Sequence, residues 1–239
     1  MNDLHDRHYE GIDHLEVMTE ARRYNHFLSN MVVAEAGGRG PVVDFGAGTG
    51  LLAEMVAATG ITVLCIEPDP TLRQRLRAKS LDAYATLDAL PAKAVPYAYS
   101  FNVLEHIDDD VEACRAIYSI LAPGGRFLVY VPAFQVLYST MDRKVGHVRR
   151  YTRQGLVDVL RLAGFIVNRS EYVDSLGFFA ALGFKYLGNA NGNIKPTSVS
   201  WYDRFAFPLS RRGDRLFHRL FGKNVLAMAE RPPAELERG

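Results

Sequence analysis

The stretch VVDFGAGTGLL (residues 42–52) determines how the rest of this sequence is interpreted. An apolar run ends in one acid, Asp44, and three glycines follow it, Gly46, Gly48 and Gly50, before a helix-like segment begins. Glycine adopts backbone dihedral angles that are closed to other residues and lets a ligand lie directly on the main chain. The near absence of side chains therefore predicts that a flat ligand contacts this loop.

Strand-like and helix-like segments alternate on both sides of the loop. The expected strands are 41–45, 61–69, 82–85, 97–102, 126–133 and 165–173; the expected helices are 49–60, 70–79, 108–125 and 152–164. The helix 108–125 is expected to close in a Pro-Gly-Gly turn, and the helix 152–164 to begin at an N-cap, Thr152, and to stop at Gly164. This alternation predicts an α/β fold, a doubly wound parallel sheet with helices on both faces.

The remaining segments are interpreted as additions to one domain that spans residues 1–239. Apolar residues at three- and four-residue spacing predict a helix over 15–36, part of an N-terminal helical cap (1–38). The cofactor-binding core is expected at 41–173 and 223–231, where the last strand lies beside 165–173. Residues 174–222 interrupt the alternation and are expected to form a helical insertion.

The composition excludes several classes of protein. The 239 residues are 48% hydrophobic and 23% charged, with a net charge of +1, so nothing in the charge favours a nucleic-acid partner. No apolar run approaches the ~20 residues of a membrane span, and no signal core opens the chain. Cys65 and Cys114 lie in apolar stretches and are expected to be buried thiols. We therefore expect a cytoplasmic protein.

Two acids near the glycine loop indicate the kind of ligand. The loop is G-x-G-x-G, preceded by Asp44, and an acid there suits an ammonium group better than the pyrophosphate of a dinucleotide. Glu67 ends the next strand, where a carboxylate accepts hydrogen bonds from ribose hydroxyls. A nicotinamide-dependent reductase is the alternative, and the glycine spacing and Asp44 argue against it.

Four motifs, VVDFGAGTG, VLCIEPDP, SFNVLEHIDD and LAPGGRFLVYVPA, resemble in order those of the class I S-adenosylmethionine-dependent methyltransferases. The resemblance covers about 41–173 and the last strand. It implies a seven-stranded Rossmann-like sheet whose last strand is antiparallel, and S-adenosylmethionine as cofactor. Where relatives carry an acid after the third strand, this sequence has ATLDALP, so Thr86 and Leu87 are expected to line the adenine pocket, with contact through the main chain.

The resemblance also implies roles for individual cofactor-binding residues. The glycine loop is expected to contact the methionine portion and the ribose, Glu67 to hold the ribose hydroxyls, and Pro68 to lie against the adenine. Asn102 is expected to meet the amino group of the cofactor. The complete set expected to bind the cofactor is Asp44, Gly46, Ala47, Gly48, Glu67, Pro68, Thr86, Leu87, Asn102, Val103, Leu104 and Arg23.

The loop MDRKVGHVRRYT (residues 141–152) is interpreted as the acceptor side of the site. It resembles the GH-x-RRY phrase of small-molecule and glycan-modifying methyltransferases. Histidine is the side chain best suited to remove a proton near pH 7, so His147 is the candidate base, with cationic neighbours that disfavour its protonated form. Arg149 and Tyr151 are candidate acceptor contacts. The alternative is that the arginines belong to a salt-bridged connector.

Other candidates come from segments expected to cover the site. Tyr9 is a second candidate catalytic residue, and Arg23, in the N-terminal helix, is a candidate for the cofactor carboxylate. Tyr24 and His106 are candidate substrate contacts, with packing and a structural hydrogen bond as their respective alternatives. No Cys/His spacing suggests zinc, so no metal site is expected.

The insertion 174–222 has three possible roles. A lid over the acceptor pocket is preferred, with Phe178 and Trp201 as pocket residues, because the insertion precedes the last strand and emerges on the ligand face. A membrane-surface helix rich in arginine and a dimer interface are the alternatives. The chain is expected to be a monomer or a homodimer.

The function that these observations favour is methyl transfer to an oxygen or nitrogen of a small-molecule acceptor, such as a secondary metabolite or a sugar. A lipid-linked or glycan acceptor at the membrane surface is the main alternative. A protein that binds the cofactor without catalysis is a more distant one, and the sequence does not identify the acceptor.

Overall fold

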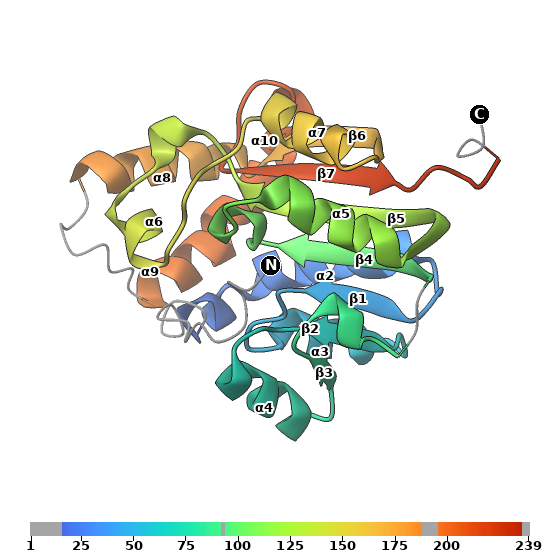
Figure 1. The fold of residues 1–239 in the computed structure, drawn as a ribbon. Helices are drawn as coiled ribbons and strands as arrows, with labels where there is room; N and C mark the ends of the chain where they lie inside the picture. The colour runs from blue at the N-terminus through green and yellow to red at the C-terminus, as the bar shows by residue number, and fades with distance from the viewer. Residues whose placement is uncertain (1–15, 92–93, 188–195, 236–239) are drawn as a thin grey trace.

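A computed structural model describes residues 16–91, 94–187 and 196–235. Seven strands form one sheet in the order β3-β2-β1-β4-β5-β7-β6 (Figure 1). The strands are β1 (Val42–Phe45), β2 (Val63–Ile66), β3 (Asp82–Tyr84), β4 (Val95–Phe101), β5 (Leu121–Pro132), β6 (Ile166–Val173) and β7 (Asn224–Glu230). The predicted doubly wound sheet is confirmed.

The direction of each strand determines where the loops meet. β2, β1, β4 and β5 pair in parallel, whereas β7 runs antiparallel to both β5 and β6. In Figure 1 the arrowhead of β4 therefore points left and that of β7 points right. The predicted antiparallel last strand beside 165–173 is confirmed, and the carboxyl ends of the parallel strands share one edge.

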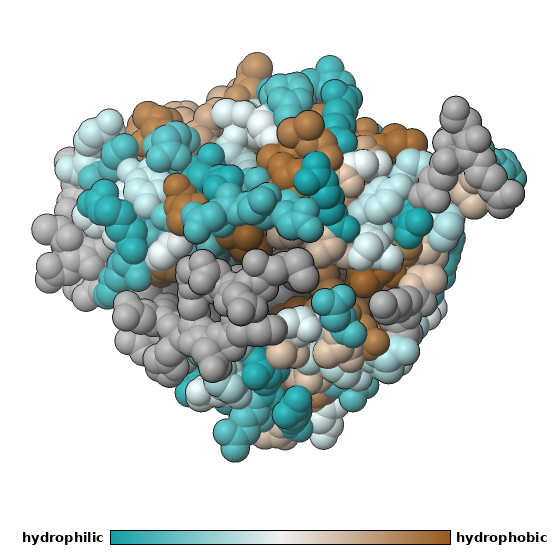
Figure 2. Space-filling view, in the orientation of Figure 1, coloured by the Kyte–Doolittle hydropathy of each residue, from teal (hydrophilic) through white to brown (hydrophobic). Residues whose placement is uncertain are grey.

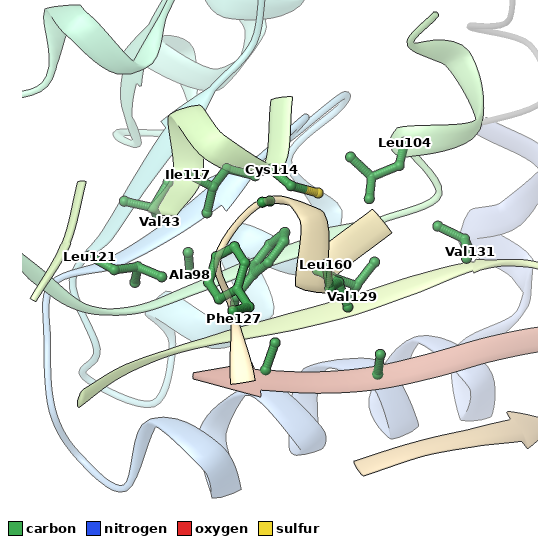
Figure 3. Packing of buried hydrophobic residues seen from close by; sticks show 14 of the residues in the cluster. Val43, Ala98, Leu104, Cys114, Ile117, Leu121, Phe127, Val129, Val131 and Leu160 are labelled. Carbon is green, nitrogen blue, oxygen red and sulfur yellow. The ribbon is translucent and has the colours of Figure 1, made fainter. Parts of the chain in front are cut away.

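The helices of the alternating part cover both faces of the sheet. They are α2 (Arg22–Ala36), α3 (Leu51–Ala57), α4 (Pro70–Ala78), α5 (Asp110–Ile120) and α7 (Arg153–Leu162). Alternate residues of the strands enter two apolar clusters. One contains Phe127, Val129 and residues of α5 and α7 (Figure 3), and the other contains Leu128, Tyr130 and residues of α2 and α3. Both faces of the sheet are thus buried.

One predicted boundary is wrong. The Pro-Gly-Gly segment does not close a helix, because α5 already ends at Ile120 and β5 starts at Leu121. Gly124 adopts a φ of +74°, and its N–H donates to the carbonyl of Arg231 at 2.9 Å. The segment is an irregular start of the strand that the chain after β7 holds in place. The N-cap Thr152 is confirmed, since its hydroxyl accepts the N–H of Gly155 at 3.0 Å.

The N-terminal helix is shorter than predicted. A short 3-10 helix, η1 (Met18–Glu20), precedes α2, and the chain turns at Ala21 between them. Asp203 then provides the N-terminal cap of α2, since its carboxylate accepts the N–H groups of Arg23 and Tyr24 at 2.9 and 2.8 Å. A carboxylate at the start of a helix accepts hydrogen bonds from otherwise unpaired amides and interacts favourably with the helix dipole. The insertion thus fixes where α2 begins.

The insertion is helical, as predicted. It contains α8 (Ser175–Leu187), α9 (Pro196–Trp201), a π-helix η5 (Tyr202–Ala206) and α10 (Phe207–Phe217). The carboxylate of Asp214 in α10 accepts the N–H groups of Asp174 and Ser175 at the start of α8. Figure 1 shows these helices at the end of the sheet to which β4 points, and Figure 2 shows hydrophilic residues interspersed with smaller apolar patches on this face. No helix in the described part of the chain is long and apolar enough to cross a bilayer.

Candidate active site

The glycine loop after β1 lies at the shared edge, next to the end of β2. The N–H groups of Gly46 and Ala47 both donate to the carbonyl of Ile66, at 2.9 and 3.0 Å. Gly46 has a φ of +85°, and a Cβ added there would lie 2.3 Å from the side chain of Val103. A side chain at this position is therefore excluded by Val103, the residue after Asn102, as well as by the backbone conformation.

Glu67 joins the glycine loop to the turn after β2. The side chain is only 6% exposed. Its Oε2 accepts the N–H of Gly48 at 2.8 Å and its Oε1 accepts the N–H of Asp69 at 2.9 Å. Each carboxylate oxygen has two acceptor positions, so both oxygens retain one for a further donor such as a ribose hydroxyl. Burial raises the pKa of Glu67, and the backbone bonds from Asp69 and Gly48 oppose that rise.

Asp44 is a buried acid beneath the loop. It is 5% exposed, and burial raises its pKa to about 7, an effect that the Tyr99 hydroxyl opposes and the charge of Glu67 reinforces. A carboxyl group in this state loses its proton more readily when a cation approaches. The arrangement therefore suits a ligand that carries an ammonium group.

Asn102 follows β4 directly and adopts a φ of +55°, which is uncommon for a residue with a side chain. Its N–H donates to the carbonyl of Tyr130 on β5 at 2.8 Å, and the residue is exposed. Asparagine tolerates this left-handed conformation better than most residues. The turn directs the chain from β4 into η3 (Leu104–His106).

A polar network lies beside η3, in the loop that follows β5. Nδ1 of His147 lies 2.8 Å from Oδ1 of Asp142, which also accepts from Nε of Arg150 at 2.8 Å. Nη2 of Arg150 and the N–H of Ser139 bond the second oxygen. Burial raises the pKa of Asp142, but His147 and Arg150 outweigh it and hold that pKa well below its usual range.

Glu105 and His106 face this network from η3. Oε1 of Glu105 lies 3.7 Å from Nε2 of His147, and the rings of His106 and His147 meet edge to face with centroids 4.6 Å apart. Burial raises the pKa of Glu105 to about 8. Burial, followed by the charge of His147, lowers the pKa of His106 to about 4. One potential ligand atom from each of Glu105, His106 and His147 lies within 4.8 Å of the other two, a grouping that the sequence did not indicate.

A sequence profile for the family described as a methyltransferase domain matches residues 16–169, more than half of the chain. The chain belongs to the class I S-adenosylmethionine-dependent methyltransferase family. A probable S-adenosylmethionine-dependent methyltransferase of Mycolicibacterium smegmatis is 27% identical over 162 residues, which cover 63% of this chain and 60% of that protein. A ubiquinone biosynthesis O-methyltransferase of Xanthomonas axonopodis pv. citri is 35% identical over 98 residues, 37% of this chain and 41% of that protein.

Solved structures show the same fold. Burkholderia thailandensis 1,6-didemethyltoxoflavin-N1-methyltransferase, bound to 1,6-didemethyltoxoflavin and S-adenosylhomocysteine, superposes with a TM-score of 0.59 at 17% identity, covering 92% of this chain and 83% of that one. The matches to the two curated relatives span only 60% and 41% of their lengths. S-adenosylmethionine is the cofactor of the methyltransferase family to which this chain belongs.

Most of the expected cofactor residues of this methyltransferase lie at the ends of β1–β4. Gly46, Ala47, Gly48, Pro68, Thr86 and Val103 are half-buried there, Asn102 is exposed, and Asp44 and Glu67 are buried. Two of the expected contacts have buried side chains. Leu104 is 0% exposed and Leu87 is 8% exposed, and both belong to the apolar cluster beneath the site (Figure 3 shows Leu104). Their side chains support the core, and contact of either residue with the cofactor stays a prediction.

Two of the three N-terminal candidates, Arg23 and Tyr24, lie in the described part of the chain. Tyr9 lies outside the described residues. Arg23 is exposed and lines a surface groove along α2 with His26 and Asn30, so its side chain lies on the outer side of that helix. Tyr24 packs edge to face against Tyr130 and Phe207, with centroids 6.1 and 5.5 Å apart. That packing is the alternative stated for it, and a ligand contact by either residue stays a prediction.

Two candidates in the loop after β5, Tyr151 and Arg149, bond residues at the start of α5. The hydroxyl of Tyr151 donates to Oδ2 of Asp110 at 2.7 Å and is also 3.1 Å from the carbonyl of Leu104, and the residue is 4% exposed. Arg149 bonds the same carboxylate at 2.9 Å and the carbonyl of Asp108 at 2.7 Å. These contacts tie the loop to the start of α5, which is the structural alternative stated for the arginines, and an acceptor contact by either residue stays a prediction.

The two aromatic candidates of the insertion differ in exposure. Phe178 is partly buried among Phe134, Phe179 and Phe221, and through Phe134 it reaches the end of β5. Trp201 is 62% exposed and packs on Phe205. Their contact with an acceptor stays a prediction. The sequence did not single out Asp142, which is the centre of the network. The feature that could have indicated it is an acid in a loop otherwise rich in basic residues, four residues before the Gly146-His147 pair.

Proposed function

We propose that this protein transfers the methyl group of S-adenosylmethionine to an oxygen or nitrogen atom of a small-molecule acceptor. The observation that carries this proposal is the His147–Asp142 pair, which faces Glu105 and His106 of η3, the turn that follows Asn102 at the end of β4, where the family binds its cofactor. A histidine oriented by a carboxylate is a typical general base. A base is needed chiefly when the acceptor is a hydroxyl.

The proposed reaction is in-line attack of the acceptor atom on the methyl carbon of the sulfonium. When bound, the cofactor supplies an already electrophilic methyl group, so the protein contributes mainly position and exclusion of water. Gly46 and Glu67 shape the cofactor side, and His147 receives the proton of a hydroxyl acceptor. The methylation of oxygen by the ubiquinone-biosynthesis relative and of nitrogen by the toxoflavin-pathway enzyme supports both acceptor classes.

A direct test combines cofactor titration and transfer. Isothermal titration is expected to show binding of S-adenosylmethionine and none of NADH, and labelled methyl transfer is expected with members of a panel of phenols, sugars and amines. Cofactor binding without transfer to any class would favour a binding protein. Binding of NADH in place of S-adenosylmethionine would contradict the proposal.

Glu67→Ala should weaken S-adenosylmethionine binding. The loss of a charged acceptor for two ribose hydroxyls corresponds to about 1.5–3 kcal/mol, roughly 10- to 150-fold in affinity. Because Glu67 also bonds Gly48 and Asp69, the thermal midpoint must be measured beside the titration. Glu54→Ala, in the exposed ion pair with Lys79, is the control and should change neither. An unchanged affinity in Glu67→Ala would refute this placement of the ribose.

A lipid-linked acceptor at a membrane surface is the second candidate function, and the surface of the insertion favours it. In α10 and just after it, Leu209, Leu216 and Leu220 are 53%, 76% and 66% exposed. Arg212 and Arg215 are exposed on the same segment. Exposed apolar side chains next to arginines are typical of helices that lie on anionic lipid. Other large apolar side chains exposed in the insertion are Leu176, Phe179, Tyr186, Trp201, Phe205 and Phe217.

Vesicle sedimentation tests this second candidate. Wild-type protein should bind vesicles that contain anionic lipid, and Arg212→Glu with Arg215→Glu should weaken that binding by about tenfold or more, at roughly 1 kcal/mol per charge. Arg211 is not a suitable target, because it pairs with Asp214 at 2.6 Å. The double variant Arg39→Glu with Arg161→Glu has the same change in charge on other exposed positions. Equal loss in both double variants, or no binding by wild type, would contradict the membrane role and leave the lid and the dimer interface as roles of the insertion.

A further inference from the structure

Glu105, His106 and His147 form a compact group of possible metal ligands. One ligand atom from each lies within 4.8 Å of the other two, and Oε1 of Glu105 is 3.7 Å from Nε2 of His147. Ligand atoms bound to one tetrahedral zinc-like ion at about 2.0–2.2 Å lie roughly 3.3–3.6 Å apart. The separation between Glu105 and His147 already nearly fits, and the side chains need to move by roughly 1 Å in total to share one ion.

The burial of Glu105 has no explanation in the contacts of the described residues. Its side chain is 0% exposed, and neither carboxylate oxygen has a hydrogen-bond partner among the described residues. The 3.7 Å separation from His147 is too long for a hydrogen bond. Burying an unpaired carboxylate costs several kcal/mol, so such groups are normally paired or coordinate a metal. Glu105 faces two imidazole rings, yet its carboxylate has no hydrogen-bond partner among the described residues.

Asp142 prepares His147 for coordination. Its carboxylate accepts a hydrogen bond from Nδ1 of His147 at 2.8 Å, which places the proton on Nδ1 and leaves the lone pair of Nε2 facing Glu105. Arg150 and Ser139 hold Asp142 in turn. Histidines that bind metal ions usually donate their other ring N–H to a carboxylate, which fixes their orientation. The surroundings of His147 match that arrangement.

We propose that Glu105, His106 and His147 bind one divalent transition-metal ion, which holds an oxygen of the methyl acceptor beside the cofactor. Two imidazoles and one carboxylate favour ions such as Zn²⁺ or Fe²⁺ over Mg²⁺ and Ca²⁺, which prefer oxygen ligands. Three protein ligands leave at least one coordination position open. Glu105 lies just beyond Asn102 at the end of β4, so that position adjoins the expected cofactor site.

The chemistry of such an ion fits a hydroxyl acceptor. A bound cation lowers the pKa of an oxygen ligand and makes it a better nucleophile near pH 7. With the ion bound, Nε2 of His147 is a ligand and no longer the base, so the acceptor hydroxyl gives its proton to solvent. Its oxygen bonds the methyl carbon, and the carbon–sulfur bond breaks to leave a neutral thioether. This second half of the inference rests on the proposed function, whereas metal binding does not.

The test begins with full-length protein freed of metal by dialysis against a chelator. Titration with Zn²⁺ should show one site that depends on the three ligands, with Mg²⁺ binding more weakly. Co²⁺ should give a visible absorption band stronger than that of Co²⁺ in buffer. Glu105→Gln, which keeps the shape of the side chain, and His106→Gln should each weaken this site by about 100-fold or more. Asp142→Asn should weaken it by roughly 10- to 100-fold, as expected for a positioning residue.

His26→Gln is the matched control, because His26 is exposed on α2 and lies outside the group. Circular dichroism shows whether each variant is folded, and His106→Gln replaces Glu105→Gln if the latter is not. Equal Zn²⁺ binding by wild type and by a folded ligand variant would overturn the proposal. S-adenosylmethionine titration separates the two hypotheses. Cofactor binding without a ligand-dependent metal site would refute only the metal, and a metal site without cofactor binding would refute only the proposed function.

Discussion

His147→Ala is expected to lower the turnover of methyl transfer to a hydroxyl acceptor by about 10²- to 10⁴-fold, equivalent to about 3–5 kcal/mol. The affinity for S-adenosylmethionine should not change. The ring is 15% exposed, with Nδ1 bonded to Asp142 and Nε2 directed toward Glu105. A carboxylate, that of Asp142, bonds this ring, whereas the sequence predicted arginines around it. Asp142 therefore sets the orientation of the His147 ring, and both a general base and a metal ligand need a fixed orientation.

The control for this variant is His26→Ala, which should keep wild-type turnover because His26 is exposed on α2. Turnover is measured at saturating cofactor, beside isothermal titration and a thermal midpoint. A small loss of turnover would indicate a nitrogen acceptor with a free lone pair, which needs no base. A fall in cofactor affinity, or in stability alone, would show that His147 is structural. Addition of Zn²⁺ to metal-free wild-type enzyme distinguishes the two roles of His147. Activity should rise if His147 is a metal ligand and should not change if it is only a base.

The topology could be predicted because it depends on local patterns. Runs such as 42–45 and 63–66 are mostly apolar and too short for helices, so they are predicted to be interior strands. The start of β5 could not be predicted in this way. Gly124 and Gly125 look like a turn, yet both exchange hydrogen bonds with Arg231. A partner so distant in the sequence leaves no local signal.

The same reason explains which parts of the site were missed. Asp44, Gly46 and Glu67 lie at strand ends, where the sequence predicts ligand contacts. Asp203 and Asp214 cap helices that begin far from them along the chain, and neither matches a local capping pattern. Glu105 and His147 belong to different loops, so the sequence places both at one edge of the sheet without bringing them together. The burial of the Leu104 side chain could not be predicted either, because it depends on how η3 turns that side chain into the core.

Asp44→Asn is expected to stabilise the cofactor-free protein at pH 8 by about 2–4 kcal/mol while weakening S-adenosylmethionine binding roughly 10- to 100-fold. Burial raises the pKa of Asp44 from 3.8 to about 7, with the Tyr99 hydroxyl opposing that rise and Glu67 reinforcing it. A rise of about three pKa units corresponds to roughly 4 kcal/mol. Asparagine has the same shape and carries no charge to bury.

The effect should depend on pH in a defined direction. Below about pH 4, the folded and unfolded states both hold the proton, so wild type and variant differ little. Between about pH 4 and pH 7 the unfolded chain releases the proton while the folded protein retains it, and the stability of wild type falls as the pH rises. Above about pH 7 the difference between the two proteins is constant. Denaturant titrations at pH 4, 6 and 8 measure this trend.

An acid that destabilises the free protein is retained for a reason, and the ammonium group of the cofactor provides one. When that cation pairs with Asp44, the carboxylate is no longer an uncompensated buried charge. Ionising Asp44 then costs less free energy, so more of the free energy of binding is retained. Asp88→Asn, at an exposed position of the loop after β3, is the control and should leave both stability and affinity unchanged. Parallel pH profiles of the free energy of unfolding for wild type and Asp44→Asn would show that the pKa of Asp44 is not raised in the folded protein. Unchanged cofactor affinity in a stabilised variant would show that Asp44 does not bind the ammonium group.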